Sequence, residues 1–229
     1  MKAKNYVYTC LMLFLLVSSV TIGILFRWNL QDCGISKISN IAEVKQCDVR
    51  LNYAWEKGDE YGITSIAEEA MNGTSTIFAA SIIAIVTPTG NIHQTEGSFG
   101  QEIAIKKVLY GREDLVGQVA YVYQNFGYSA ASGRVEFLNT LNVMYPENEY
   151  LIFMDESPLN PYQQRPVFLL RSEYLGYIRT DFHTTKTLTS TYKGILFSDL
   201  NEYEFFSESE TITDALNTAR AFLLCRYLN

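Results

Sequence analysis

The sequence has few of the residues on which enzymatic and metal chemistry usually depends. It contains two histidines, His93 and His183, and four cysteines among 229 residues. It has no Gly-x-Ser-x-Gly or His-Glu-x-x-His motif and no glycine-rich phosphate-binding loop. No two cysteines have the close spacing of a zinc site. We therefore predict no catalytic set, no bound metal and no cofactor. An envelope enzyme with an unrecognised site remains the alternative.

The carboxylates and histidines are also poorly arranged for catalysis. Glu68 and Glu69 are adjacent, and so are Asp155 and Glu156. Neighbours on a helix point in different directions, and neighbours on a strand face opposite sides of the sheet. Neither pair therefore predicts the two facing carboxylates of a glycoside hydrolase. The two histidines fall in predicted loops, where surface positions are more common than catalytic ones.

The cysteine count leaves the disulfide pairing open. Three cysteines, Cys33, Cys47 and Cys225, lie beyond the apolar N-terminal segment, and an odd number is not typical of a fold built on disulfides. In an oxidising compartment Cys33 can pair with Cys47, and counting alone equally allows a Cys47–Cys225 bridge. Reduced thiols are also consistent with a bacterium that forms few disulfides.

Charged side chains are absent from residues 6–26, the segment from Tyr6 to Phe26 that reads YVYTCLMLFLLVSSVTIGILF. At about 1.5 Å per residue, one helix of this length crosses a hydrocarbon core about 30 Å thick. Lys2 and Lys4 precede the segment, and basic flanks stay on the cytoplasmic side. We therefore predict that residues 1–27 form an anchor in the lipid bilayer. The N-terminus would lie in the cytoplasm and the rest of the chain outside.

Two other readings of this segment remain. A cleaved signal peptide also begins with positive charge and an apolar core. However, the run is longer than a usual signal core. Bulky residues follow it from Phe26 to Leu30, where a cleavage site needs small ones. A helix buried in a soluble protein is the second alternative. The length and the flanks favour the uncleaved anchor over both.

The charge of the remaining chain limits its partners. Three of the 18 basic residues and none of the 25 acidic residues lie at or before Arg27. Residues 28–229 thus carry 15 basic and 25 acidic side chains, a net charge of −10. This balance argues against binding nucleic acid or anionic lipid headgroups through charge. An extracellular protein or a glycan is the partner class that we expect.

Beyond the anchor, we predict a connecting region over residues 28–60 and one domain over residues 61–229. Ser65 and Glu68 have capping-box spacing, and Asn72-Gly73 is a stop signal, so a short helix precedes the strands. An apolar stripe at helical spacing predicts a last helix over residues 210–228.

Short apolar or β-branched segments separated by turns lie between these two helices. We predict strands within residues 77–86, 101–109, 119–124, 150–154, 167–170 and 174–178. No segment of helix length lies between successive strands. The pattern therefore favours a mainly β domain with flanking helices (α+β), built on a small closed or partly closed barrel rather than on a parallel α/β sheet.

The order of the segments also has a familiar form. The relevant stretches are AASIIAIV at residues 79–86, VLYG at 108–111, VAYVY at 119–123 and NEYLIFM at 148–154. Over roughly residues 62–180 the chain resembles bacterial surface domains with the OB-type barrel of tissue inhibitors of metalloproteinases. Tyr110 replaces the usual Lys before Gly111, and Asn148 stands where Gly is expected. The resemblance implies a barrel used for binding. The inhibitory chemistry is not implied, because no Cys opens the folded region.

The densest group of aromatic and amide side chains comprises Tyr121, Tyr123, Asn125 and Tyr128. Alternation along a strand places Tyr121 and Tyr123 on one face. Exposed tyrosines beside an amide recognise sugar rings or peptides, and we predict these four residues as a ligand-binding site. The alternative is that the rings cover the barrel or pack beneath the last helix.

The sequence as a whole predicts a single-pass, outward-facing binding or interaction module, from a bacterium with a Gram-positive-type envelope. Two other functions are kept open. One is the envelope enzyme named above. The other is inhibition of an extracellular protease by loop insertion.

Overall fold

The computed structural model describes residues 12, 18, 19, 21, 38–51, 60–94, 99–124, 126–129, 134–137, 141–157, 165–188 and 197–228. The chain divides into two compact units, Met1–Lys37 and Ile38–Asn229, and the elements discussed below belong to the second. Within the described ranges, no helix combines the length and the apolar character that crossing a membrane requires. The predicted anchor falls almost entirely outside these ranges and stays a prediction.

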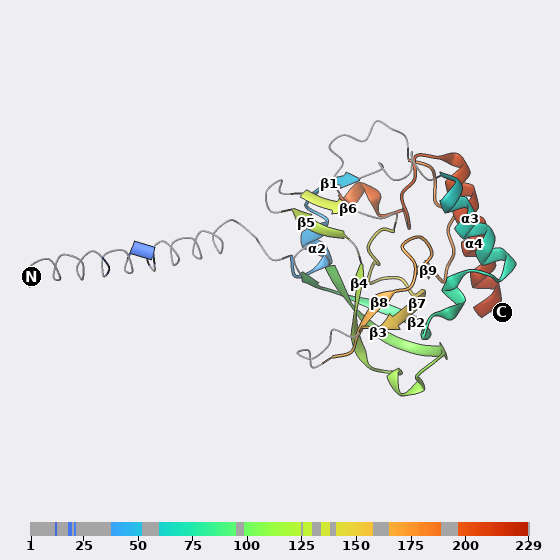
Figure 1. Ribbon diagram of the computed structural model, residues 1–229, viewed down its shortest axis with the longest axis horizontal. Coiled ribbons are helices and arrows are strands. Elements are labelled where there is room, and N and C mark those ends of the chain that lie inside the picture. Colours follow the sequence, from blue (N-terminus) through green and yellow to red (C-terminus); the bar gives the residue numbers. More distant parts are fainter. Residues whose placement is uncertain are drawn as a thin grey trace, which may run out of the picture. The chain divides into compact units, whose positions relative to one another are not determined.

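Five strands form a closed mixed barrel (Figure 1). They are β2 (Ile82–Gln94), β3 (Phe99–Tyr110), β4 (Val119–Gln124), β7 (Tyr150–Glu156) and β8 (Val167–Leu170). Their hydrogen-bonded order is β2-β3-β4-β8-β7, and β7 pairs with β2 to close the barrel. The β4–β8 pair is parallel, whereas the other four pairs are antiparallel. This arrangement is compatible with the predicted OB-like barrel.

Side-chain alternation explains which faces of the strands are buried. In β4 the exposure alternates residue by residue, so that Ala120, Val122 and Gln124 are buried while Tyr121 and Tyr123 are half-buried. In contrast, β7 is buried at five successive positions, because one face lines the barrel interior and the other is covered. The continuous apolar run YLIFM is the sequence signal of such a strand.

Two helices pack side by side on one flank of the barrel, as Figure 1 shows. They are α3 (Glu60–Asn72) and α4 (Glu210–Leu228), and their buried residues join the same apolar core as the barrel strands. The ring of Tyr227 on α4 meets Phe153 of β7 edge to face at 5.5 Å. A helix before the barrel and a C-terminal helix are thus confirmed. However, α3 begins at Glu60, so Ser65 lies inside it and the predicted capping box is wrong.

A buried ion pair fixes α4 to the chain segment before it. Arg220 pairs with Glu204, and their side chains are only 1% and 4% exposed. The Arg179 backbone amide also donates to Glu204, over 3.2 Å. Removing one partner of such a pair leaves an uncompensated buried charge, which is strongly destabilising. The position of α4 against the barrel therefore depends on charge pairing as well as on apolar packing.

The shorter elements extend the domain at the other end of the barrel from the helices (Figure 1). These elements are α2 (Ile41–Val44), β1 (Asp48–Leu51), β5 (Phe126–Ser129), β6 (Arg134–Phe137) and η3 (Phe197–Leu200). Three further short elements lie on the barrel itself: η1 (Thr76–Ala79), η2 (Glu113–Leu115) and β9 (Tyr177–Arg179). The sheet order is β1-β6-β5, and a second apolar cluster includes residues of α2, β1, β2 and η3. Residues 38–51, inside the predicted connecting region, belong to this unit.

The cysteines occupy separate places. Cys47 is half-buried beside the second apolar cluster, with its Sγ 3.4 Å from the Glu43 carbonyl oxygen. Cys225 is a free, exposed thiol on α4, so the Cys47–Cys225 bridge is not formed. Cys33 lies outside the described residues, and its pairing with Cys47 stays a prediction.

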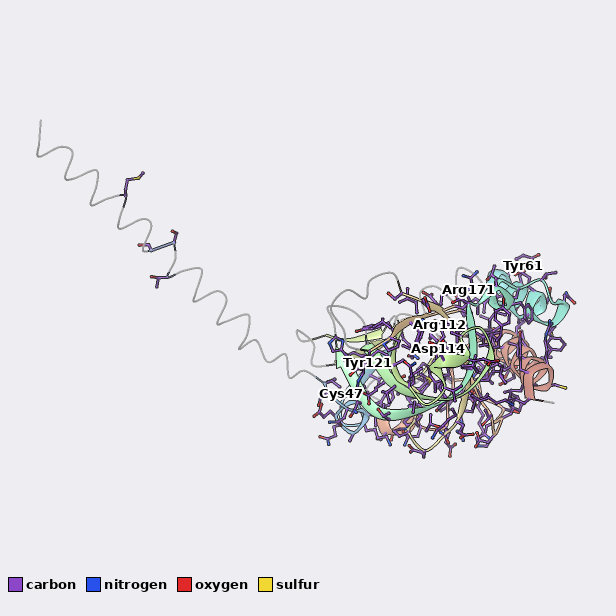
Figure 2. The ribbon with its side chains drawn as sticks, turned by 90° about the horizontal axis from the view of Figure 1, so that it is seen from below. Cys47, Tyr61, Arg112, Asp114, Tyr121 and Arg171 are labelled. Carbon is purple, nitrogen blue, oxygen red and sulfur yellow. The ribbon has the colours of Figure 1, made fainter. Side chains whose placement is uncertain are left out.

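The Asp155 carboxylate ties the start of β2 to the end of β7. It accepts hydrogen bonds from the Ser81 amide (2.8 Å) and from Arg171 (2.9 Å), a residue labelled in Figure 2. Arg171 also donates to the Thr76 carbonyl over 3.0 Å. Burial raises the pKa of Asp155, but the Ser81 and Arg171 bonds outweigh it, so the pKa lies below its ordinary value.

We expect Asp155→Asn to destabilise the domain at neutral pH by about 1 kcal/mol, because its charge-assisted bonds are partly exposed to solvent. A lowered folded-state pKa gives stabilisation that is complete above the unfolded-state pKa, about 3.9 for Asp, and is lost as pH falls through the folded-state value. Urea unfolding at pH 7 and at about pH 2.5 measures this effect. An equal difference between wild type and variant at both pH values would contradict it.

Candidate ligand-binding site

Polar and aromatic side chains gather on the outside of β2, β3 and β4. We name this surface the outer tyrosine face; it comprises Asn91, His93, Gly100, Glu102, Tyr121 and Tyr123. The strand register places His93 opposite Gly100 and Gly100 opposite Tyr123. It also places Glu102 opposite Tyr121. Positions paired across antiparallel strands share a face, so these side chains project from one side of the sheet.

Tyr123 lies across the neighbouring strand rather than standing upright. A Cβ on Gly100 would come within 2.8 Å of the Tyr123 Cζ, so the outer part of the ring rests on this glycine. The Tyr123 hydroxyl is 2.6 Å from Nδ1 of His93, and the two rings meet edge to face at 6.2 Å. The strand therefore supports the ring, and the hydrogen bond fixes its far end.

His93 brings the second tyrosine into the same group. Its ring centroid is 5.7 Å from that of Tyr121, with an angle of 48° between the planes. His93 is exposed, and both tyrosines are half-buried. Figure 2 shows Tyr121 at the opposite end of the domain from Tyr61 of α3. Three rings from two strands thus form one surface that is well separated from the helix pair.

The Glu102 carboxylate holds the polar part of this surface in place. Its Oε1 accepts hydrogen bonds from Thr89 (2.7 Å) and Asn91 (2.9 Å). Its Oε2 accepts one from the Tyr121 hydroxyl (3.3 Å) and pairs with Arg165. Glu102 is only 7% exposed, and four donors match the acceptor capacity of a carboxylate. It therefore orients its neighbours and has no lone pair left for a general base.

The structure brings together two of the four residues that the sequence predicts for the site. Tyr121 and Tyr123 share the barrel's outer face, as alternation predicts. Asn125 lies outside the described residues. Tyr128 belongs to β5, and its backbone pairs with that of Val135 in β6.

Sequence analysis missed His93, Glu102 and Arg165 as members of this site. The β2–β3 register shifts between Pro88 and Ile92, so the distance between residues 93 and 123 cannot be counted along the sequence. Arg165 comes from a segment more than 40 residues further along the chain. A polar side chain at an outward strand position, as with Glu102, is the one sequence signal, and it is common on any exposed sheet.

His183 lines a separate pocket of about 340 Å³. The other lining residues are Arg179, Thr184, Lys186, Asn201, Glu202 and Tyr203. Nδ1 of His183 is 3.1 Å from the Phe182 carbonyl, which only accepts, and Nε2 is 3.2 Å from an Arg179 nitrogen, which only donates. Both ring nitrogens are therefore engaged. Among the described lining residues, Thr184 offers a hydroxyl, but His183 already uses both nitrogens with other partners and so is not positioned as its base.

Comparison of the sequence with protein-family models found no match, and comparison with curated proteins found none. Among the residues described, no group of three or more His, Cys, Asp or Glu side chains is arranged to hold a metal ion. A barrel of this type supports many functions, so a function must be argued from the outer tyrosine face itself.

We expect Gly100→Ala to displace the Tyr123 ring, because the added methyl group occupies the place of the ring's outer edge. The loss should be about 1–2 kcal/mol of unfolding free energy, as for other overpacking substitutions. In a Tyr123→Ala background the same change should be neutral or stabilising, because alanine suits a strand better than glycine. A double-mutant cycle by urea unfolding measures the difference. Equal effects in the two backgrounds would show that the ring does not rest on Gly100.

Proposed function

We propose that this protein is a membrane-anchored binding module that faces outward and recognises its partner on the outer tyrosine face. One observation carries the proposal: three aromatic rings are held in place by neighbouring groups. These groups are Gly100, the hydrogen bond between His93 and Tyr123, and the Glu102 carboxylate, whose acceptor sites are all occupied. Such support holds the rings in position before a ligand arrives, and this lowers the entropy lost on binding. The polar groups of the face are used to orient one another, which suits recognition better than proton transfer.

The position of the face on the barrel supports the same proposal by analogy. In OB-type barrels the face of the second and third strands is a frequent ligand site. Here those strands are β3 and β4, which carry Glu102, Tyr121 and Tyr123. The likeness to the tissue inhibitors of metalloproteinases is taken as a likeness of scaffold. The analogy adds to the geometric evidence and does not replace it.

Membrane attachment and orientation enter the proposal from the sequence. Residues 6–26 are uncharged and long enough to cross a bilayer, and Lys2 and Lys4 favour a cytoplasmic N-terminus. The acidic remainder, with a net charge of −10, suits an extracellular protein or a glycan as partner better than a nucleic acid.

The anchor is tested with the full-length chain carrying a C-terminal tag. We expect the tag to be accessible to antibody on intact cells whose wall has been permeabilised, and the chain to stay with membranes in alkaline carbonate. Replacing both Leu15 and Leu16 by Lys should release it, because each charge costs about 2.5–3.5 kcal/mol at the centre of a spanning helix. A wild-type chain that alkaline carbonate extracts from the membranes, or a tag reached only after lysis, would contradict the proposed location.

Binding is tested by co-sedimentation with envelope fragments from the bacterial host. The full-length protein is kept in a detergent without a sugar headgroup, so that the detergent does not compete. We expect the wild type to sediment with the fragments and Tyr123→Ala to bind at least about tenfold more weakly. Tyr61→Ala is the matched control, since Tyr61 is 85% exposed on the distant helix α3. Absence of wild-type binding, or equal binding by Tyr123→Ala, would overturn the binding role of this face.

A further inference from the structure

Resting on the proposed binding role of the outer tyrosine face, we infer that its ligand is an uncharged carbohydrate, with one sugar ring stacked on Tyr123. The inference goes beyond the proposed function because it selects one partner class from the two that the proposal leaves open. Four features of the face lead to it: a flat platform, two side-chain polar groups beside it, compensated charge, and strands whose edges are already paired.

The platform is the Tyr123 ring. One side of the ring rests on Gly100, and the His93 bond holds its hydroxyl end. The half-buried ring is therefore flat against the sheet and cannot swing outward without losing both contacts. The C–H groups on one face of a pyranose ring pack on such a surface, because the face of an aromatic ring carries partial negative charge. A lone exposed tyrosine without this support would lose more freedom on binding.

Two polar groups lie close to the platform. His93 uses Nδ1 in its contact with Tyr123, and Asn91 uses its side-chain NH₂ to reach Glu102. Within the described part of the chain, Nε2 of His93 and Oδ1 of Asn91 have no hydrogen bond. An imidazole nitrogen and an amide oxygen are suitable partners for the hydroxyl groups at the edge of a sugar ring.

The charges of the face are compensated. Glu102 pairs with Arg165, and the two oxygens of its carboxylate receive four donors in total. The guanidinium of Arg165 also lies 5.8 Å from the centroid of the Tyr121 ring. A charged ligand group would have to compete with these existing partners and with the acidic domain. An uncharged polyol binds without disturbing them.

Closed pairing of the strands disfavours an extended peptide. Peptides that bind to sheets usually add a strand at an exposed edge, where the backbone supplies most of the hydrogen bonds. At the outer tyrosine face, β3 lies between β2 and β4, and β4 is paired on its other side with β8. Both edges of β3 and β4 are therefore occupied at this face. A ligand on this face is recognised by side chains, which suits a saccharide better than a peptide backbone.

The test repeats the co-sedimentation assay with envelope fragments treated in two ways. Periodate cleaves the vicinal diols of sugar rings, and proteinase K digests proteins. We expect periodate to reduce binding of the wild-type protein at least about tenfold and proteinase K to leave it unchanged. Soluble uncharged polysaccharide released from the fragments should compete for binding.

The outcomes separate the carbohydrate inference from the proposed function. Binding that survives periodate and is lost after proteinase K would overturn the carbohydrate ligand and leave a protein-binding role for the face. Absence of binding to untreated fragments would overturn the proposed function itself. Tyr123→Phe should retain binding within about threefold, because the platform remains without its hydroxyl, and Tyr123→Ala should not. Unfolding transitions of both variants establish that a weakened Tyr123→Ala is still folded. A Tyr123→Phe as weak as Tyr123→Ala would overturn the stacking geometry.

Discussion

The double pairing of β2 is the constraint on which the rest of the domain depends. One edge of this strand bonds to β3 and the other to β7, so that a curved sheet becomes a closed barrel. Closure gives each of the five barrel strands two neighbours and fixes the interior width, which apolar side chains from the strands fill. It also sets where each outer side chain lies relative to its neighbours. The site on the outside is thus a consequence of the pairing that builds the core.

The irregularities of β2 contribute to this geometry. The β2–β3 register shifts at three places, and the largest shift, between Pro88 and Ile92, takes up residues 89–91, which include Gly90 and directly follow the proline. Bulges bend and twist a strand, and proline is tolerated in a sheet at such points. The shift carries His93 to its place opposite Gly100, where it meets Tyr123. Without the shift, the histidine and the two tyrosines would not form one surface.

Elements with a strong local pattern could be predicted from the sequence, whereas contacts between elements could not. Residues 119–124 form a strand with the predicted bounds, and the last helix spans Glu210–Leu228. The residue at which β2 begins could not be predicted from the local pattern. Residues 77–80 are apolar and continue into the β-branched run of the strand, yet Thr76–Ala79 forms a short 3₁₀ helix that Ser75 caps. The turn predicted at residues 87–91 lies inside β2, because pairing with β3 overrides the local preference of Pro88 and Gly90.

The candidate site shows the same division. Alternation along one strand is enough to place Tyr121 and Tyr123 together. The roles of His93 and Glu102 depend on the register of three strands, which the hydrophobic pattern specifies weakly on a polar face. Gly100 gives no signal at all in the sequence, since its importance is the close approach of a ring from the next strand.

The rigid outer tyrosine face and the proposed membrane anchor together have a thermodynamic consequence for binding. In the proposed role, each ligand contact would come from a side chain already held by its neighbours, so little freedom would be lost on binding, but the contact area of three rings is small. Single-site affinity should therefore be modest. The proposed bilayer anchor would hold many copies in one plane, and a polymeric ligand would offer many repeats, so a second contact would form at high effective concentration. In the proposed role, attachment to the membrane and weak recognition of a repeating ligand thus support each other.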